Sequence, residues 1–192
     1  AHLSGPWMLS IDGLRDVSAR QKTLRGAIGW SHDLLPPDEQ TLFKRLSVFV
    51  GGCTLQAAGA VCLPSLSPNE VLNGIASLLD KSLLHREMGL HGGSRYAMLE
   101  TIREYALERL AAGEEASEAR DRQLAWCLTV AASAVSSPFG ILEQESWKHI
   151  DAEIHNLSSG LEWALQHNAA AALQLTIATS RSLASRGFVR DA

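Results

Sequence analysis

Cysteine is scarce in this chain, which has three in 192 residues: Cys53, Cys62 and Cys127. Their spacing matches no zinc ribbon or zinc finger, and an odd number of thiols does not build a disulfide framework. Cys53 and Cys62 could in principle meet, but the unpaired third thiol favours a reducing compartment. We therefore expect buried, inert thiols, no metal, and a cytoplasmic location.

Long apolar runs and an excess of basic residues are also missing. No run approaches the roughly 18 apolar residues that a membrane span needs. Seventeen Lys and Arg against 21 Asp and Glu give a net charge of −4, the wrong sign for a dedicated nucleic-acid or anionic-membrane binder. Because 46% of the residues are hydrophobic, the chain can bury a core. The sequence therefore predicts a folded protein without a membrane partner.

Two further signatures are absent. Residues 1–6 contain neither an initiator Met nor the charged and apolar segments of a signal peptide, so we expect a fragment cut from a longer chain. A phosphate-binding loop needs Gly-x4-Gly-Lys-Ser/Thr. The chain's two Lys-Ser/Thr pairs, Lys22-Thr23 and Lys81-Ser82, lack the preceding glycines. We expect this fragment alone to bind no cofactor and to catalyse no reaction.

Residues 36–113 show a regular succession of amphipathic patterns. A helical pattern over 20–35 stops at Pro36-Pro37, and three further helices are indicated by Thr54 and Ser67 as N-caps between apolar stripes. The three stripes are Leu42, Phe43, Leu46, Phe49 and Val50; Leu55, Ala58, Val61 and Cys62; and Val71, Leu72, Ile75, Leu78 and Leu79. A glycine-rich tip at 88–94 then predicts a β-hairpin, and Leu99, Ile102, Ala106 and Leu110 predict a fourth helix. This order of elements is that of a winged helix–turn–helix.

Residues 114–192 are alanine-rich and helical in pattern. We expect one helix from about 117 to 135, a second with the stripe Trp147, Ile150, Ile154, Leu157, Leu161 and Leu165, and a third carrying Leu173, Ile177 and Leu183. Helices joined by short breaks suggest an antiparallel helical array, such as the first units of a repeat domain. The fold class expected for the whole chain is mainly α, with a small β-hairpin wing.

Several sequence blocks, in order, resemble one protein family. They are residues 23–25 and 30–35 (TLR, WSHDLL), 46–52 (LSVFVGG), 78–84 (LLDKSLL), 96–106 (YAMLETIREYA) and 151–157 (DAEIHNL). Together they resemble the region after the nucleotide-binding domain in bacterial STAND signalling ATPases of the NB-ARC-like type, and in large transcriptional regulators with TPR-like helical repeats. The resemblance implies that 1–35 end a helical linker, that 36–113 form the winged-helix domain, and that 114–192 begin the repeats.

The resemblance also implies a function. In that family the winged helix folds back on the nucleotide-binding domain as an intramolecular latch that responds to ADP or ATP with Mg, and the helical repeats bind a partner or signal. The family's Met-His-Asp motif, whose His contacts a phosphate, aligns with Met98, Leu99 and Glu100. Leu99 cannot donate a hydrogen bond, so we do not expect it to sense a phosphate. It could pack inside the winged helix or against the missing nucleotide-binding domain, and its spacing with Ile102, Ala106 and Leu110 favours the first placement. Glu100 would act mainly as a charge at the helix start.

Other candidate sites are weaker. Ser31-His32-Asp33 has the three residue types of a catalytic triad, but sequence neighbours rarely point at one another as a triad requires. Glu145, His149 and Glu153 share a helical face with metal-ligand spacing, although a solvated face is the simpler interpretation. Trp126, Trp147 and Trp163 are expected in the helix packing, with an exposed aromatic anchor for a partner as the alternative.

DNA binding is the alternative function, because many winged helix–turn–helix domains bind DNA. A recognition helix offers Arg, Lys, Asn or Gln to DNA. The third helix, 68–80, has Asn69, Glu70 and Asn73 but neither Arg nor Lys, and the wing offers Arg86 and Arg95. We therefore expect a non-catalytic regulatory fragment that contacts protein, with a winged-helix DNA-binding transcription factor as the alternative.

Overall fold

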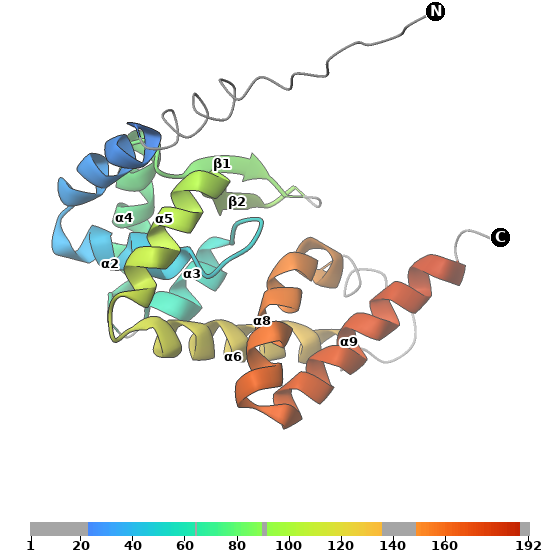
Figure 1. The fold of residues 1–192 in the computed structure, drawn as a ribbon. Coiled ribbons are helices and arrows are strands. Elements are labelled where there is room, and N and C mark those ends of the chain that lie inside the picture. Colours follow the sequence, from blue (N-terminus) through green and yellow to red (C-terminus); the bar gives the residue numbers. More distant parts are fainter. Residues whose placement is uncertain (1–22, 64, 90–91, 136–148, 189–192) are drawn as a thin grey trace, which may run out of the picture.

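The first half of the structure is a cluster of helices with a small hairpin at one edge (Figure 1). The computed structural model describes residues 23–63, 65–89, 92–135 and 149–188. An initial helix spans residues 23–33, followed by α2 (Pro37–Leu46), α3 (Leu55–Cys62) and α4 (Pro68–Asp80). The strands β1 (His85–Met88) and β2 (Ser94–Ala97) form the wing, and α5 (Glu100–Ala111) follows.

Local sequence signals set the starts of α3 and α4. The Thr54 hydroxyl accepts a hydrogen bond from the Ala57 amide at 3.1 Å. At α4, the Ser67 hydroxyl accepts from the Glu70 amide while the Glu70 carboxylate accepts from the Ser67 amide, which completes a capping box. Pro68 occupies the first turn, where its missing N–H leaves no helical hydrogen bond unmade. Both N-caps predicted from the sequence are confirmed.

The wing is an antiparallel pair with His85 opposite Ala97 and Met88 opposite Ser94. Cys53 adds a bridge on the other side of β2, because its amide donates to the Tyr96 carbonyl at 2.9 Å and its carbonyl accepts from the Tyr96 amide at 2.8 Å. The segment after α2 therefore lies directly against the wing.

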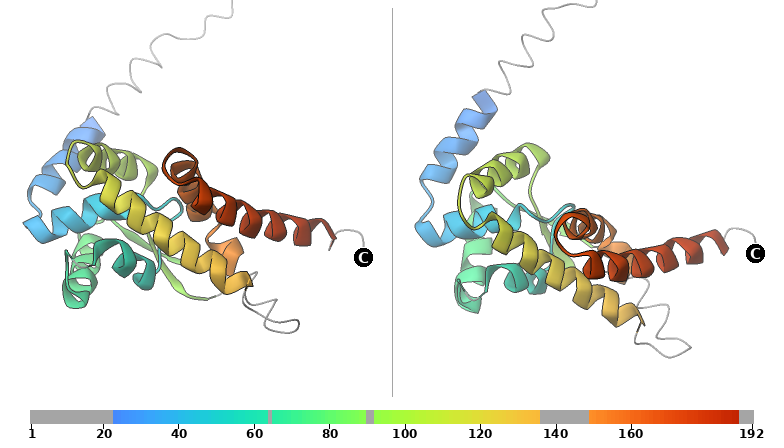
Figure 2. Two further views of the ribbon diagram at one scale, coloured as in Figure 1. Left: turned by 90° about the horizontal axis from the view of Figure 1, so that it is seen from below. Right: turned by 60° about the horizontal axis from the view of Figure 1, so that its bottom comes forward.

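Three longer helices complete the described chain: α6 (Ala116–Val135), α8 (Ile154–His167) and α9 (Ala169–Phe188). They pack against one another, and α6 also packs along α3, so that α6 joins the winged helix to the last two helices (Figure 2). A helical turn at 149–152 precedes α8. In the described ranges, no helix is both long and apolar enough to cross a membrane.

One continuous core runs through both halves of the structure. Leu42, Phe43, Val61, Ile75 and Leu78 fill the winged helix and are almost fully buried. Cys127, Ile150, Leu157 and Leu175 fill the space between α6, α8 and α9. Phe49 and Trp126 join the two groups, with their rings edge to face and 5.8 Å apart. The mainly helical winged-helix fold predicted from the sequence is confirmed, followed by further helices.

Some predicted apolar stripes extend too far. Helix α2 ends at Leu46, so Phe49 is buried from the following loop and not from the helix. Leu55 and Leu72 are 41% and 49% exposed, although the sequence places them on buried stripes. On α9 the face predicted from Leu173 and Ile177 is the exposed one. The buried face of α9 is formed by neighbouring residues, three alanines and one leucine: Ala171, Ala172, Leu175 and Ala178.

Candidate functional site

Helix α4 lies where a winged helix–turn–helix presents its recognition helix, and its outer face carries little charge. Asn69, Glu70, Leu72 and Asn73 are exposed there. No Lys or Arg occurs from Pro68 to Asp80. Lys81 follows directly, but its ammonium pairs with Glu39 at 2.9 Å. This face can offer amides to a partner, and it has no cation to place against a phosphate.

The two arginines of the wing differ in their surroundings. Arg86 is exposed and donates to the Ser94 hydroxyl across the strand pair, at 3.0 and 2.6 Å. Arg95 is only 8% exposed and points away from solvent. Its guanidinium pairs with Glu153 through two hydrogen bonds, one of them 3.1 Å long, and also donates to the Gly52 carbonyl at 2.8 Å. Arg95 is therefore unavailable to a DNA backbone.

The partner of Arg95 lies in the segment just before α8. Glu153 is 2% exposed and is held on its other side by Asn156, whose side-chain amide donates to the carboxylate at 2.7 Å. Burial acts to lower the pKa of Arg95, but the hydrogen bonds and the charge of Glu153 outweigh it and raise that pKa above its ordinary value. Arg95 therefore keeps its positive charge inside the structure.

Asn156 completes this junction between the winged helix and the C-terminal helices. It is fully buried, accepts from the Val50 amide at 2.7 Å and donates to the Gly52 carbonyl at 3.0 Å. Glu153 and Asn156 lie in the block 151–157 that carries part of the family resemblance. The sequence pattern predicts a solvated position for Glu153, and this prediction is wrong because the side chain is 2% exposed. One feature of the sequence could have indicated its burial: Glu153 comes directly before the apolar stripe of Ile154 and Leu157.

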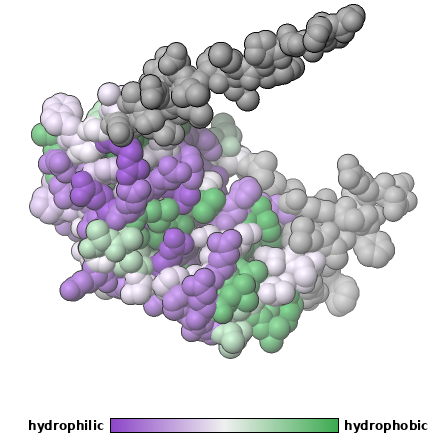
Figure 3. Space-filling model, viewed as in Figure 1, coloured by the Kyte–Doolittle hydropathy of each residue, from purple (hydrophilic) through white to green (hydrophobic). Residues whose placement is uncertain are grey.

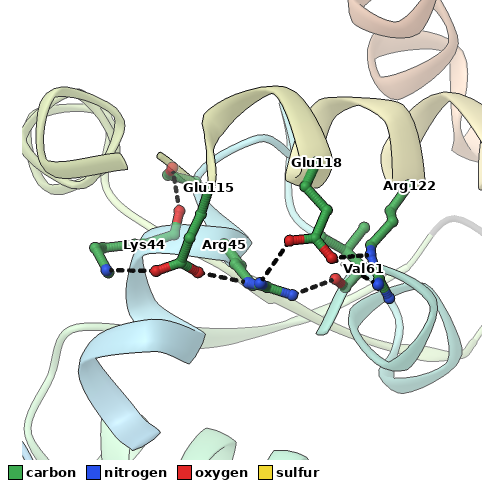
Figure 4. Close-up of polar contacts among 7 residues, drawn as sticks. Lys44, Arg45, Val61, Glu115, Glu118 and Arg122 are labelled. Atoms are coloured by element: carbon green, nitrogen blue, oxygen red, sulfur yellow. Dashed lines mark hydrogen bonds and ion pairs between the residues drawn. The ribbon is translucent and has the colours of Figure 1, made fainter. Parts of the chain in front are cut away.

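A second polar junction lies at the start of α6 (Figure 4). The buried Arg45 of α2 donates to Glu115 at 3.0 Å, to Glu118 at 3.3 Å and to the Val61 carbonyl at 3.4 Å. Lys44 also pairs with Glu115, at 3.1 Å. Glu115 and Glu118 bracket the start of α6, where carboxylates are favoured by the helix dipole. Arg45 thus fixes α6 to α2 and α3.

Most basic side chains of the winged helix already have partners within the chain. Residues 35–111 contain seven Lys and Arg against eight Asp and Glu. Five of the seven pair with carboxylates: Lys44, Arg45, Lys81, Arg95 and Arg103. The other two donate to hydroxyl groups, Arg86 to Ser94 and Arg109 to Tyr105. A phosphate would have to compete with these contacts, so the surface is poorly suited to non-specific DNA binding.

The three residues aligned with the family's phosphate-sensing motif lie at the start of α5. Leu99 is the N-cap residue and is 60% exposed, so the prediction that it packs on the buried stripe is wrong. The stripe begins at Ile102, because Leu99 still has extended backbone angles and does not share the helical period. Met98 is half-buried against the core. Glu100 pairs with Arg103, which lowers the pKa of the Glu100 carboxyl.

These three side chains do not fit a nucleotide phosphate. Leu99 has no polar group, and Glu100 would repel a phosphate. Arg103, one helical turn after Glu100, donates to both oxygens of Glu100 at 3.0 and 2.7 Å. A phosphate at this position would therefore have to displace a carboxylate that is already in place.

The catalytic and metal candidates are not assembled. His32 contacts Asp33 at 3.1 Å, but the Ser31 hydroxyl donates to the Ala27 carbonyl and takes no part. His32 is buried between Phe43 and Tyr105, which makes it a packing residue. Among the residues that the structure describes, no group of three His, Cys, Asp or Glu could hold a metal. Glu145 lies outside the described residues, and Glu153 is committed to Arg95.

The tryptophans of the C-terminal helices pack within the fold where they are described. Trp126 is 8% exposed against Phe49. Trp163 is half-buried, donates to Asp121 at 2.8 Å and stacks on His167 with a ring separation of 3.6 Å. Trp147 lies outside the described residues. Trp126 and Trp163 therefore serve inter-helix packing.

Comparisons with known proteins agree with the fold. Residues 35–111 match the family model described as a winged helix-turn-helix domain. Two proteins named "Putative HTH-type transcriptional regulator", from Mycobacterium tuberculosis and Mycobacterium bovis, are 38% identical over 182 residues, which cover 93% of this chain. An "Uncharacterized protein" of M. tuberculosis is 37% identical over 98 residues, or 50% of this chain and 25% of its own length. No solved structure matches the chain significantly.

The match to the two regulators covers 20% of their length, so this chain spans about one fifth of the curated relatives it matches. The names of these two proteins describe transcriptional regulators and mention no enzyme activity. By fold and by sequence, the chain contains a winged helix–turn–helix domain and is homologous to one part of mycobacterial proteins that are named as HTH-type transcriptional regulators.

Proposed function

We propose that this chain is a segment of a transcriptional regulator in which the winged helix contacts protein and does not read DNA through α4. The names of the homologous proteins support the regulatory role. The protein-contact role is supported above all by Arg95, the cation of β2 in the wing, which is buried in an ion pair with Glu153. A wing that donates its arginine to the C-terminal helices cannot donate it to a phosphate.

Three properties of α4 point the same way. Its exposed face lacks cations, it carries Glu70 and Asp80, and Leu72 is half exposed on it. Specific base contacts come mainly from Arg and Lys to guanine and from Asn and Gln to adenine, on top of phosphate contacts that supply most of the affinity. On α4, Asn69 and Asn73 could contact adenine, but no side chain could provide the contacts to guanine or to phosphate. An apolar and amide-rich face is better suited to a protein partner.

DNA binding through the winged helix is the second candidate, and the comparisons favour it. The matched family is a winged helix-turn-helix domain, and the relatives are named for their HTH. In this case α4 would enter the major groove with Asn69 and Asn73 towards the bases, and Arg86 would contact the backbone. The relatives are about five times longer than the match, so their DNA contacts can also come from another part of the polypeptide.

Fluorescence anisotropy with duplex DNA at about 0.15 M salt, where charge interactions are already screened, separates the two candidates. We expect no binding tighter than the non-specific range of roughly 10⁻⁴–10⁻⁶ M, and no dependence on sequence. A nanomolar complex with a selected sequence, weakened by Asn73→Ala and by Arg86→Ala, would establish the second candidate. Glu118→Gln, on α6 and outside both α4 and the wing, serves as a control that should not change DNA binding.

The resemblance to STAND ATPases adds one further proposal. Here the winged helix would pack on a nucleotide-binding domain outside this chain, and ADP or ATP with Mg bound there would set the packing. Because residues 98–100 do not fit a phosphate, the winged helix would respond to the surface of that domain and not to the nucleotide itself. Isothermal titration of this chain with ADP and with ATP should then show no saturable heat, and micromolar binding would contradict this division of roles.

A further inference from the structure

The guanidinium of Arg95 is held at the start of α8 in the way that a DNA phosphate would hold it. Two nitrogens of Arg95 donate hydrogen bonds to the two oxygens of the Glu153 carboxylate. A phosphate group presents its oxygens to an arginine in the same forked geometry. Glu153 therefore occupies the position that a phosphate would take beside this arginine of the wing.

The contacts around this ion pair are polar as well. Glu153 is the residue directly before α8, and Asn156, in the first turn of α8, donates to the Gly52 carbonyl at 3.0 Å. The Val50 amide in turn donates to the Asn156 side chain at 2.7 Å. Water can replace each of these hydrogen bonds when the groups separate, which keeps the net cost of opening well below the sum of the bonds.

Helix α8 is anchored independently of the wing. It packs along α6 and α9, where Leu157 and Ala164 are buried. Apolar side chains gather at the lower right of Figure 3, where α8 meets α9, at the end of α8 that lies away from the wing. Figure 1 shows the wing extending towards the opposite end, the start of α8. The pair of Arg95 with Glu153 can therefore open while α8 stays packed on its neighbours.

Opening the pair would give the wing a cation on each of its two faces. Arg86 lies opposite Tyr96 across the strand pair, and Arg95 lies opposite Glu87, so the two arginines belong to opposite faces of the hairpin. Arg86 is already exposed. A hairpin that enters a groove of duplex DNA has a phosphate backbone on either side. Arg86 can then contact one backbone and a released Arg95 the other.

We propose that the pair of Arg95 with Glu153 is an autoinhibitory contact, which withholds Arg95 from DNA while it is closed and makes Arg95 a phosphate-contacting residue when it opens. The C-terminal helices thereby set whether the wing binds duplex DNA. Autoinhibition rests on the proposed function in one respect, that the closed chain binds DNA only in the non-specific range. The open wing gains affinity without sequence preference, because phosphate contacts carry no direct sequence information.

Charge-matched variants of the full chain test the autoinhibitory contact by fluorescence anisotropy with duplex DNA. Glu153→Gln keeps the size of the side chain and releases Arg95, so we expect about tenfold tighter binding at about 0.05 M salt. The slope of log affinity against log salt should steepen by about 0.9, the value for one further phosphate contact. Glu153→Gln with Arg95→Gln restores the net charge of the unsubstituted chain and should bind like it.

Glu114→Gln is the control for charge alone. Glu114 is exposed just before α6, and its substitution removes the same charge as Glu153→Gln. Because solvent and salt screen an exposed charge, we expect the affinity of this variant to stay within about twofold of the unsubstituted chain. A gain equal to that of Glu153→Gln would contradict autoinhibition.

Autoinhibition is overturned if Glu153→Gln is folded by circular dichroism and binds DNA no tighter than the unsubstituted chain. It is also overturned by a gain that persists in Glu153→Gln with Arg95→Gln. If Glu153→Gln does not fold, Glu153→Asp takes its place, because the shorter acid weakens the pair, and a smaller gain that Arg95→Gln removes is expected. Sequence-specific nanomolar binding by the unsubstituted chain would contradict the proposed function instead, and the change in Glu153→Gln would still decide autoinhibition.

Discussion

Arg95 in β2 and Glu153 just before α8 are 58 residues apart in the sequence and form a buried ion pair between the wing and the C-terminal helices. The Gly52 carbonyl accepts a further hydrogen bond from Arg95, and the Asn156 side-chain amide donates one to Glu153. A buried pair of this kind is sensitive to the loss of one member, because the other charge is then left without a partner away from water. The wing is thereby fixed to α8.

Glu153→Gln tests this junction. The substitution leaves the size of the side chain nearly unchanged but removes the charge that Arg95 faces. We expect a loss of about 3–5 kcal/mol in the free energy of unfolding, as measured by urea denaturation, which is typical when one partner of a buried pair is removed. The control is Glu100→Gln, at an exposed pair with Arg103, where the loss should stay below about 1 kcal/mol. Equal losses for the two variants would contradict a buried junction.

Gly52→Ala tests how closely the loop after α2 approaches the wing. Gly52 has a φ of +77°, and a Cβ there would lie 2.7 Å from the Tyr96 carbonyl oxygen and 2.9 Å from the Ala97 Cβ. Gly92 also has a positive φ, of +85°, but a Cβ there would meet nothing within 4 Å. We expect Gly92→Ala to lose about 1–2 kcal/mol from backbone strain alone, and Gly52→Ala to lose clearly more. Thermal unfolding of both variants measures the difference, and similar midpoints would show that the loop can move aside.

The sequence predicts the winged helix well because its signals are local. The Thr54 cap and the Ser67 capping box mark the starts of two helices, and the glycine-rich tip marks the hairpin. Each of these depends on residues within a few positions of one another, which is the range over which pattern and propensity are reliable. The order of these elements then suffices to name the fold.

The junction could not be predicted in the same way, because it depends on tertiary contact. Arg95 and Glu153 each look like solvated charges in their own element, and only the packing of α8 on the loop at 50–52 brings them together. Leu99 and Leu173 are the opposite case, since the sequence predicts them to be buried and both are exposed. Their spacing fits a buried stripe, but Leu99 lies at the N-cap before α5, and α9 buries the face that carries Leu175 and Ala178 in place of the face of Leu173. Apolar character alone does not select the buried face of an alanine-rich helix.

The buried cysteines predict a loss of stability at high pH. Burial raises the pKa of Cys62 and of Cys127 from the ordinary 9.0 to about 12, and burial also raises the pKa of Cys53. A raised pKa in the folded state means that the unfolded chain releases these protons first. Their contribution is therefore complete below about pH 9 and declines as the pH rises towards 12. Urea unfolding at pH 7, 9 and 10.5 measures the decline.

The matched control for this pH dependence is Cys127→Ala, which should show a shallower decline between pH 9 and 10.5 than the unsubstituted chain. The same shift predicts slow reaction of the native thiols with Ellman's reagent at pH 8, because the thiolate is the reactive form. In about 6 M urea, well beyond the unfolding range of a small domain, the reaction should be fast and complete. Fast reaction without urea would show that the cysteine sites open readily.

Leu99→Ala and Ile102→Ala separate the surface of α5 from its core. Leu99 is 60% exposed at the N-cap, so its truncation should change the free energy of unfolding by no more than about 0.5 kcal/mol. Ile102, three residues later, is 7% exposed, and its truncation should lose about 2–5 kcal/mol through lost packing and the cavity left behind. Urea unfolding of both variants measures the contrast. A large loss at Leu99 would mean that this side chain packs inside the chain after all. A small loss at both positions would mean that α5 contributes little to the core. We do not expect this result, because Ala106 and Leu110 of α5 are also buried.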